Sequence, residues 1–258
     1  MTTRREMIAG AAALAASVVP APAQTSPKAF VLVHGAFHGG WCWRRVADLL
    51  EKRGQKVFAP TLTGLGARSH LLDAKVNLTT HITDIVNVIK WERLSDIVLV
   101  GHSYGGMVNI GVAERAEPTI SSIVFLDAII PENGQSAIDA YPPLGGGART
   151  ALEKQQTAIP PQPAAFFGVN EADRAWIDAL CTSQPAATFT EKIIGTGAHE
   201  RIARKAYVRA VGFPSAPFDG YLAKCRSTPG WRTYEVPSGH DVMIDVPERL
   251  TDILLEVA

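Results

Sequence analysis

The sequence predicts a domain of the α/β class, with a mostly parallel sheet covered by helices on both faces and one insertion that interrupts the pattern. Short apolar runs alternate with segments whose apolar residues recur at helical spacing, which is typical of such sheets. The chain has 258 residues, a length that suits one domain. Its hydrophobic fraction of 47% is enough for a sizeable core.

Residues 1–23 are interpreted as an export signal and set apart from the fold. Arg4 and Arg5 precede an apolar stretch of small residues at 7–19, and an A-x-A site follows at 21–23. The arginine pair indicates the twin-arginine route, and therefore a periplasmic or secreted protein. A membrane-anchoring or frayed N-terminal helix is the alternative interpretation.

The first half of the remaining chain alternates strand and helix. Residues 28–35 form an apolar run that ends in a glycine turn, which predicts a buried strand. The helix expected over 43–54 has one apolar face and ends at Gly54. The same reasoning predicts strands over 56–60, 96–101 and 120–128, which alternate with helices over 80–94 and 104–116.

The alternation fails over residues 131–200. This stretch is rich in proline and glycine, shows no strand pattern and contains one helix-like segment, 171–180. Such a long irregular stretch is usually a lid or insertion, so 131–200 is expected to be a cap on a core of 24–130 and 201–258. Strand and helix then alternate again to the end of the chain: strands over 205–211 and 231–236, and helices over 218–225 and 247–257.

Ser103 is the first candidate catalytic residue. It lies in the G-x-S-x-G pentapeptide 101–105, between a predicted strand and a predicted helix. In that context the serine turns sharply and exposes its hydroxyl above the sheet. The nucleophile of this architecture needs a base late in the chain, and His240 follows the last predicted strand. The oxyanion site is expected at the amides of Ala36 and Tyr104.

The motifs HGAFHGGWCW, PTLTGLGARSHL, GHSYGG and GHDVM resemble the α/β-hydrolase fold of the plant methylesterase and hydroxynitrile lyase branch, with its bacterial esterase relatives. The resemblance covers nearly all of the chain after the signal and is weakest in the insertion. It implies hydrolysis of a carboxylic ester through an acyl-enzyme, without a cofactor. On this likeness Ser103 is the nucleophile, His240 the base, and Ala36 and Tyr104 the oxyanion donors.

The acid of the triad departs from the family pattern. The aspartate expected after strand 205–211 is replaced, by position, by Phe213. Asp127, at the end of strand 120–128, is favoured as the acid because a strand end is rigid. Asp219 is the alternative, and Asp241 is poorly placed to reach the far nitrogen of His240.

The second departure concerns the reaction. Hydroxynitrile lyases of this branch have a threonine and a lysine where this chain has Gly35 and Asp241. An aspartate would oppose the departing cyanide that a lysine stabilises, which favours hydrolysis. A carbon–carbon lyase and a non-catalytic, receptor-like binding protein remain the alternatives; the missing family acid favours the latter.

Charge and composition limit the partners. Lysine plus arginine and aspartate plus glutamate each number 25, which gives no reason to expect nucleic acid or an anionic membrane. No stable membrane insertion is expected after removal of the signal. His34 and His38 lack a third ligand for a metal. The expected partner is a small, fairly apolar ester, and the sequence says nothing of the oligomeric state.

Overall fold

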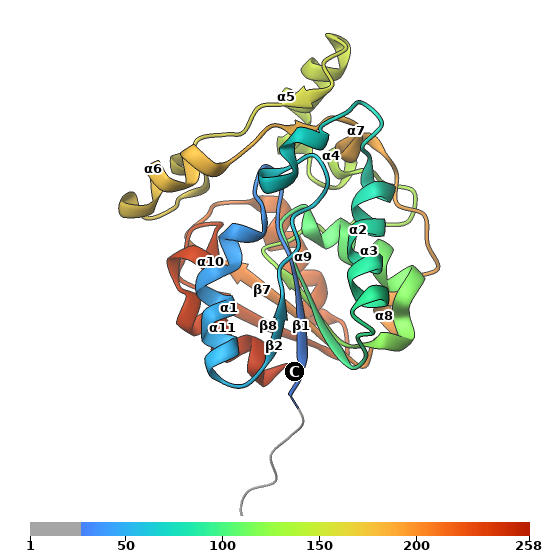
Figure 1. Cartoon of the computed structure of the whole chain (residues 1–258), viewed down its shortest axis with the longest axis vertical. Coiled ribbons are helices and arrows are strands. Elements are labelled where there is room, and N and C mark those ends of the chain that lie inside the picture. The colour runs from blue at the N-terminus through green and yellow to red at the C-terminus, as the bar shows by residue number, and fades with distance from the viewer. Residues whose placement is uncertain (1–26) are drawn as a thin grey trace, which may run out of the picture.

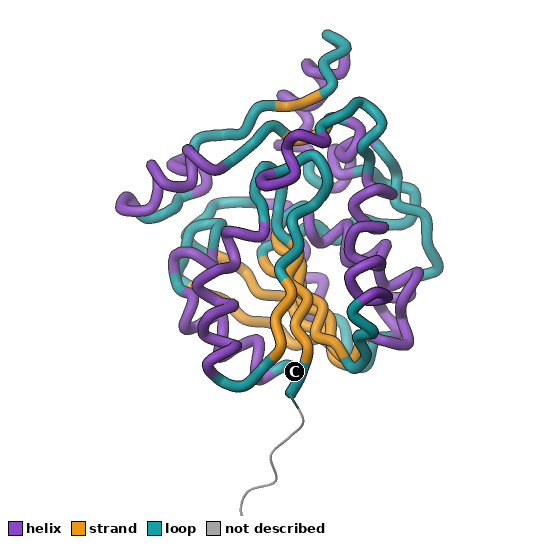
Figure 2. Tube along the Cα trace, in the orientation of Figure 1, coloured by secondary structure: helices purple, strands orange, loops and turns teal. Residues whose placement is uncertain are grey.

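The computed structural model describes residues 27–258, so the export signal predicted at 1–23 lies outside the described residues. The core is a six-stranded parallel sheet with the order β2-β1-β3-β4-β7-β8 (Figures 1 and 2). Its strands are β1 (Ala29–Val33), β2 (Lys56–Phe58), β3 (Ile97–His102), β4 (Ile120–Leu126), β7 (Arg204–Ala210) and β8 (Trp231–Val236). The predicted α/β sheet is confirmed.

Helices cover both faces of the sheet, as Figure 1 shows. The helices of one face are α1 (Arg44–Lys52), α10 (Val242–Asp245) and α11 (Pro247–Glu256). Those of the other face are α2 (Leu78–Trp91), α3 (Gly105–Ala116), α8 (Ala198–Arg201) and α9 (Ala216–Ser227). Successive β1 residues alternate between the two cores, because side chains of a strand point to opposite faces.

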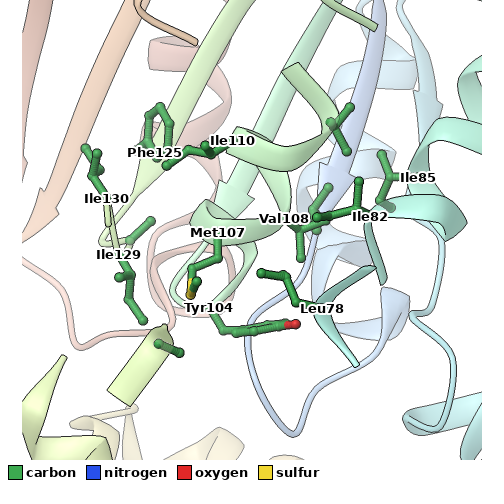
Figure 3. Close-up of a cluster of buried hydrophobic side chains, with 14 of the residues drawn as sticks. Leu78, Ile82, Ile85, Tyr104, Met107, Val108, Ile110, Phe125, Ile129 and Ile130 are labelled. Carbon is green, nitrogen blue, oxygen red and sulfur yellow. The ribbon is translucent and has the colours of Figure 1, made fainter. Parts of the chain in front are cut away.

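The packing of α2 against α3 supports the turn that carries Ser103. Leu78, Ile82 and Ile85 of α2 lie beside Met107 and Val108 of α3 in one buried cluster (Figure 3). The N-terminus of α2 is fixed by a capping box, in which the Asn77 side chain accepts from the amide of Thr80. The first turn of α3 therefore packs against a helix whose own N-terminus is capped.

The carboxyl ends of the central strands meet at one edge of the sheet. Val33 pairs with Gly101, and Leu126 pairs with both His102 and Val208. The chain passes from β1 outward to β2 and returns to β3 on the other side of β1. Ligands of open α/β sheets bind at such a reversal of strand order, outside the carboxyl ends.

The 131–200 segment covers this edge, at the top of Figure 1. The elements of this segment that precede α8 are α4 (Ala137–Ala140), α5 (Pro142–Glu153), β5 (Ala158–Ile159), η4 (Ala164–Phe167), α6 (Glu171–Leu180), β6 (Gln184–Pro185) and α7 (Ala187–Thr190). The sequence of this segment shows no strand pattern, but β5 and β6 pair antiparallel. Each has two residues, too few for an alternating pattern.

Three short 3₁₀ helices complete the fold: η1 (Gly40–Trp43), η2 (Gly66–Leu71) and η3 (Glu117–Thr119). Within residues 27–258, no helix combines the length and apolar character needed to cross a membrane.

Candidate active site

Ser103 lies in a tight turn between β3 and α3, with a φ of 54°. Its amide donates to Leu126 O at 3.1 Å, and its carbonyl accepts from the amide of Ile129 at 3.1 Å. A Cβ added to Gly101 would lie 2.5 Å from the carbonyl oxygen of Gly105. The flanking glycine is thus required by close backbone approach, as expected for a serine held in a strained strand–helix turn.

His240 and Asp127 are in direct contact. His240 Nδ1 lies 2.7 Å from Asp127 Oδ2, and both side chains are almost wholly buried. Asp127 follows β4 with a φ of 41°, and its Oδ1 accepts from the amide of Ala210 at 3.1 Å. Because a carboxylate only accepts, Nδ1 of His240 carries the hydrogen of this bond and Nε2 remains free to act on a hydroxyl.

Asp219, the alternative acid, lies elsewhere. Its side chain is 64% exposed and accepts from Arg209 Nε at 2.8 Å. Asp241 also has a different partner, since its Oδ2 lies 3.1 Å from His38 Nε2. Of the three aspartates considered from the sequence, Asp127 is therefore the one whose carboxylate meets the His240 ring.

Aromatic rings surround the His240 imidazole. The ring centroids of Phe167, Phe213 and Phe218 lie 5.6, 4.8 and 5.4 Å from that of His240. Phe213, at the position where the sequence comparison with the family leads one to expect an aspartate, therefore packs against the His240 ring. These rings pack around the imidazole, and Asp127 contacts it at Nδ1.

The loop after β1 is held by two histidine side chains. His34 Nδ1 donates to Gly35 O at 2.8 Å, and His34 Nε2 accepts from the amide of Leu62 at 3.0 Å. Burial lowers the pKa of His34 to about 3, so this ring is neutral. His38 Nδ1 donates to Ala36 O at 2.8 Å. The peptide groups on both sides of Ala36 are thereby fixed, including the one that carries its amide.

The predicted oxyanion donors belong to the loop after β1 and to the turn between β3 and α3. Ala36 lines the same cavity as Ser103. Tyr104 directly follows Ser103, and its buried hydroxyl lies 3.0 Å from His81 Nδ1. Within residues 27–258, the amides of Ala36 and Tyr104 donate to no protein acceptor. The Ala36 amide therefore belongs to a residue of the cavity wall and is not engaged by another group in this part of the chain.

A buried histidine–aspartate pair adjoins these residues, and sequence reasoning missed it. The side chains of His38 and Asp241 are 3% and 0% exposed. Burial alone would lower the pKa of His38, but the Asp241 carboxylate outweighs it and raises that pKa. Burial works to raise the pKa of Asp241, yet His38 and its neighbours hold it well below its usual range. His102 lies near this pair, and burial lowers its pKa well below the usual value.

The cap is hydrogen-bonded to both parts of the site. The carbonyl of Phe167 accepts from the amide of His240 at 2.8 Å. Phe37, in the loop after β1 with a φ of 68°, donates its amide to Gln184 Oε1 at 3.1 Å. The carbonyl of Phe37 accepts from the amide of Thr182 at 2.8 Å. The backbone of His240 and the loop after β1 are therefore each hydrogen-bonded to residues of the 131–200 segment.

These residues surround a cavity of about 210 Å³. Ser103 and His240 line it together, and most of the remaining wall is apolar, with the cap residues Phe166 and Phe167 among it. Trp176, in α6 of the same segment, packs against Trp41 at a centroid distance of 5.2 Å and does not line the cavity. Trp41 and Trp43 do not line it either, and Trp43 is fully buried.

Metal ligands and disulfides are not part of this geometry. In the described part of the chain, no group of three or more histidine, cysteine, aspartate or glutamate side chains could hold a metal ion. Cys42, Cys181 and Cys225 are free. What the arrangement offers is a serine hydroxyl and an imidazole held by a carboxylate at the wall of a largely apolar cavity.

Comparisons with known proteins agree with this fold. The model of the alpha/beta hydrolase family matches residues 30–253. A carbendazim hydrolyzing esterase of Nocardioides sp. (strain SG-4G) is 42% identical over 235 residues, which cover 87% of this chain and 97% of that protein. The putative chloroplastic methylesterase 11 of Arabidopsis thaliana is 28% identical, over 89% of this chain and 63% of the plant protein.

A solved structure shows the same fold. An extracellular alpha/beta-hydrolase from a Paenibacillus species superposes with a TM-score of 0.79, at 24% identity, over 90% of this chain and 99% of that one. The esterase names of the relatives support esterase activity. The chain therefore belongs to the alpha/beta hydrolase family and is a hydrolase, similar to the bacterial esterase and plant methylesterase members of that family.

Proposed function

We propose that this protein is a serine carboxylesterase that cleaves a small, uncharged, largely apolar ester through an acyl-enzyme. The observation that carries the proposal is that Ser103, His240 and Ala36 line one cavity. The His240 imidazole is bound to Asp127, and the amides of Ala36 and Tyr104 donate to no other group in residues 27–258. The hydroxyl, the imidazole and the amides each perform a separate task in acyl transfer.

The first half of the reaction forms the acyl-enzyme. Ser103 Oγ attacks the ester carbonyl while His240 Nε2 takes its proton, and Asp127 stabilises the imidazolium that results. The carbonyl oxygen becomes an oxyanion that accepts hydrogen bonds from the amides of Ala36 and Tyr104. The carbon–oxygen bond to the alcohol then breaks, and His240 gives its proton to the departing alkoxide.

The second half releases the acid. A water molecule attacks the acyl-enzyme carbonyl and passes one proton to His240. The second oxyanion that forms accepts hydrogen bonds from the same two amides. Collapse breaks the bond to Ser103 Oγ, which recovers the proton from His240. The products are one alcohol and one carboxylic acid, and the protein returns to its starting protonation state.

The cavity wall supports an apolar substrate with an aromatic part. Phe166, Phe167, Phe213 and Phe218 all line it, and flat aromatic groups pack well against such rings. Carbendazim, named in the 42% identical relative, is a suitable test substrate beside simple methyl and aryl esters. The 131–200 cap is proposed to determine which of these fit. Export of the chain through a signal at 1–23 is part of the same proposal.

Hydrolysis is preferred over carbon–carbon cleavage for two structural reasons. A Cβ added to Gly35 would lie 2.8 Å from His102 Nδ1, so this turn has no room for the threonine of the lyases. Asp241, which stands in place of their lysine, is an acidic residue buried against His38, so this position offers no cation to bind cyanide. The receptor-like alternative rested on a missing acid, and Asp127 offers His240 a carboxylate.

The test compares Ser103→Ala with Ser227→Ala, an exposed serine at the end of α9. Hydrolysis of a nitrophenyl ester should fall at least about 10³-fold in the first variant and stay unchanged in the second. A fluorophosphonate probe should label wild type and Ser227→Ala only. Near wild-type turnover by Ser103→Ala, or labelling that survives in it, would exclude Ser103 as the nucleophile. Absence of labelling in wild type would favour the binding-protein alternative.

A further inference from the structure

A buried guanidinium lies behind the Asp127–His240 pair. Arg209 belongs to β7, beside the end of β4, and its side chain is 2% exposed. Its Nη1 donates to Asp127 Oδ1 at 2.9 Å, while Oδ2 of the same carboxylate accepts from His240 Nδ1 at 2.7 Å. The two oxygens of Asp127 thus have different partners, and the guanidinium helps to decide which of them faces the imidazole.

The other donors of Arg209 hold the loop that follows β7. Nη2 donates to Phe213 O at 2.7 Å, and Nη1 also donates to the carbonyl of Ala210. Nε donates to Asp219 Oδ1 at 2.8 Å, on the solvent side. The planar fork of arginine can satisfy several such acceptors at once, which a lysine ammonium on a flexible stem cannot.

Charge balance gives Asp219 a part in this arrangement. Asp127 and Arg209 neutralise each other, so alone they would attract an imidazolium at His240 only weakly. Asp219 restores one net negative charge to the group. Burial works against the charge of Arg209, but Asp127 and Asp219 outweigh it, and the pKa of the guanidinium is raised above its usual value.

We propose that Arg209 is a positioning residue for the catalytic carboxylate and that Asp219 is its counter-charge, in a chain that runs Asp219–Arg209–Asp127–His240. The inference rests on the proposed function, in which Asp127 is the acid. Arg209 does not line the cavity and acts through Asp127. It fixes the rotation of that carboxylate and moderates its attraction for the protonated base.

The two outer members of the chain should shift the pH profile in opposite directions. Arg209→Gln leaves Asp127 uncompensated, which favours protonated His240 and moves the acidic limb of kcat/KM upward by about one pH unit. Asp219→Asn removes a negative charge and should move the limb downward by about a few tenths, less at 1 M salt because that side chain is exposed. The other charged or titratable groups near His240 stay unchanged in both variants: His38, His102 and Asp241.

Geometry is separated from charge by Arg209→Lys. This variant keeps the cation but loses the fork, so kcat should fall about 10-fold while the acidic limb stays close to that of wild type. Arg204→Gln is the matched control, because Arg204 is also on β7 and donates to Ser122 Oγ of β4 at 2.8 Å, at the far end of the strand. It should leave both kcat and the limb unchanged.

A double variant tests whether Arg209 acts through Asp127. Arg209→Gln should lower kcat/KM of wild type but cause less than about a twofold further loss in an Asp127→Asn background, since coupled groups are not additive. Equal losses in both backgrounds, or limbs of Arg209→Gln and Asp219→Asn that move together or not at all, would overturn the inference. If Arg209→Gln does not fold by circular dichroism, Arg209→Lys and Asp219→Asn decide the matter. A fully active Asp127→Asn would instead overturn the proposed acid itself.

Discussion

The buried pair of His38 and Asp241 should be important for stability, and Asp241→Asn tests it. The two side chains are 3% and 0% exposed and their charged atoms lie 3.1 Å apart, so solvent screens them very little. Removing one partner of such a pair costs about 3–5 kcal/mol in the free energy of unfolding. For a domain of this size, that corresponds to a fall of roughly 6–20 °C in Tm.

The matched control is Asp48→Asn. Asp48 pairs with Arg44 at 3.1 Å on the surface of α1, with side chains 42% and 77% exposed. Its loss should cost less than about 1 kcal/mol. Thermal unfolding followed by circular dichroism at pH 7 measures both variants. If Asp241→Asn melts within about 2 °C of wild type and of the control, the reasoning that a charged pair is buried here is refuted.

The pH dependence of the same measurement has a defined sign. The folded-state pKa of His38 is raised above 6.5, so its stabilisation is fully present below pH 6.5 and is lost as pH rises through the folded value. The pKa of Asp241 is lowered, so its contribution is present above pH 3.8 and is lost as pH falls. Wild type should therefore lose stability on the alkaline side, and Asp241→Asn should lose less there.

Three further predictions concern the cavity and the loop after β1. Gly35→Ala places a Cβ 2.8 Å from His102 Nδ1, so we expect a cost of about 1–3 kcal/mol and reduced kcat; unchanged melts and kinetics would contradict this. Gln184→Ala leaves the buried amide of Phe37 unpaired, which should lower kcat about 10-fold with little change in KM, and an unaltered kcat would argue against the coupling. Phe166→Ala should raise KM for aryl esters but not for a small acetate; equal effects on both would show that Phe166 does not contact the aromatic group.

The fold was readable from the sequence because each core strand and helix carries its own periodic pattern. Strand 28–35 and helix 80–94 correspond to β1 and α2 within a few residues at each end. β5 and β6 were not predictable, because two residues cannot display a period and their pairing depends on the cap's own path.

The candidate site was partly readable for a similar reason. Ser103 lies in a local motif, and Gly101 of that motif is required by its close approach to the carbonyl oxygen of Gly105. The favoured acid, Asp127, followed from the rigidity of a strand end. The partners of Arg209 and His38 were missed, because they come from sequence positions 82 and 203 residues away and are brought together only by the packed sheet.

The hydrogen bonds from the cap to Phe37 and His240 have a consequence for how such enzymes diverge. A cap that only covered the pocket could be exchanged between relatives to change substrate specificity while kcat stayed constant. Here, exchange of the stretch from Phe167 to Gln184 should change kcat as well. Chimeras with a junction inside this stretch should change substrate specificity and kcat together. Junctions placed outside it take the cap and the residues hydrogen-bonded to it from the same parent.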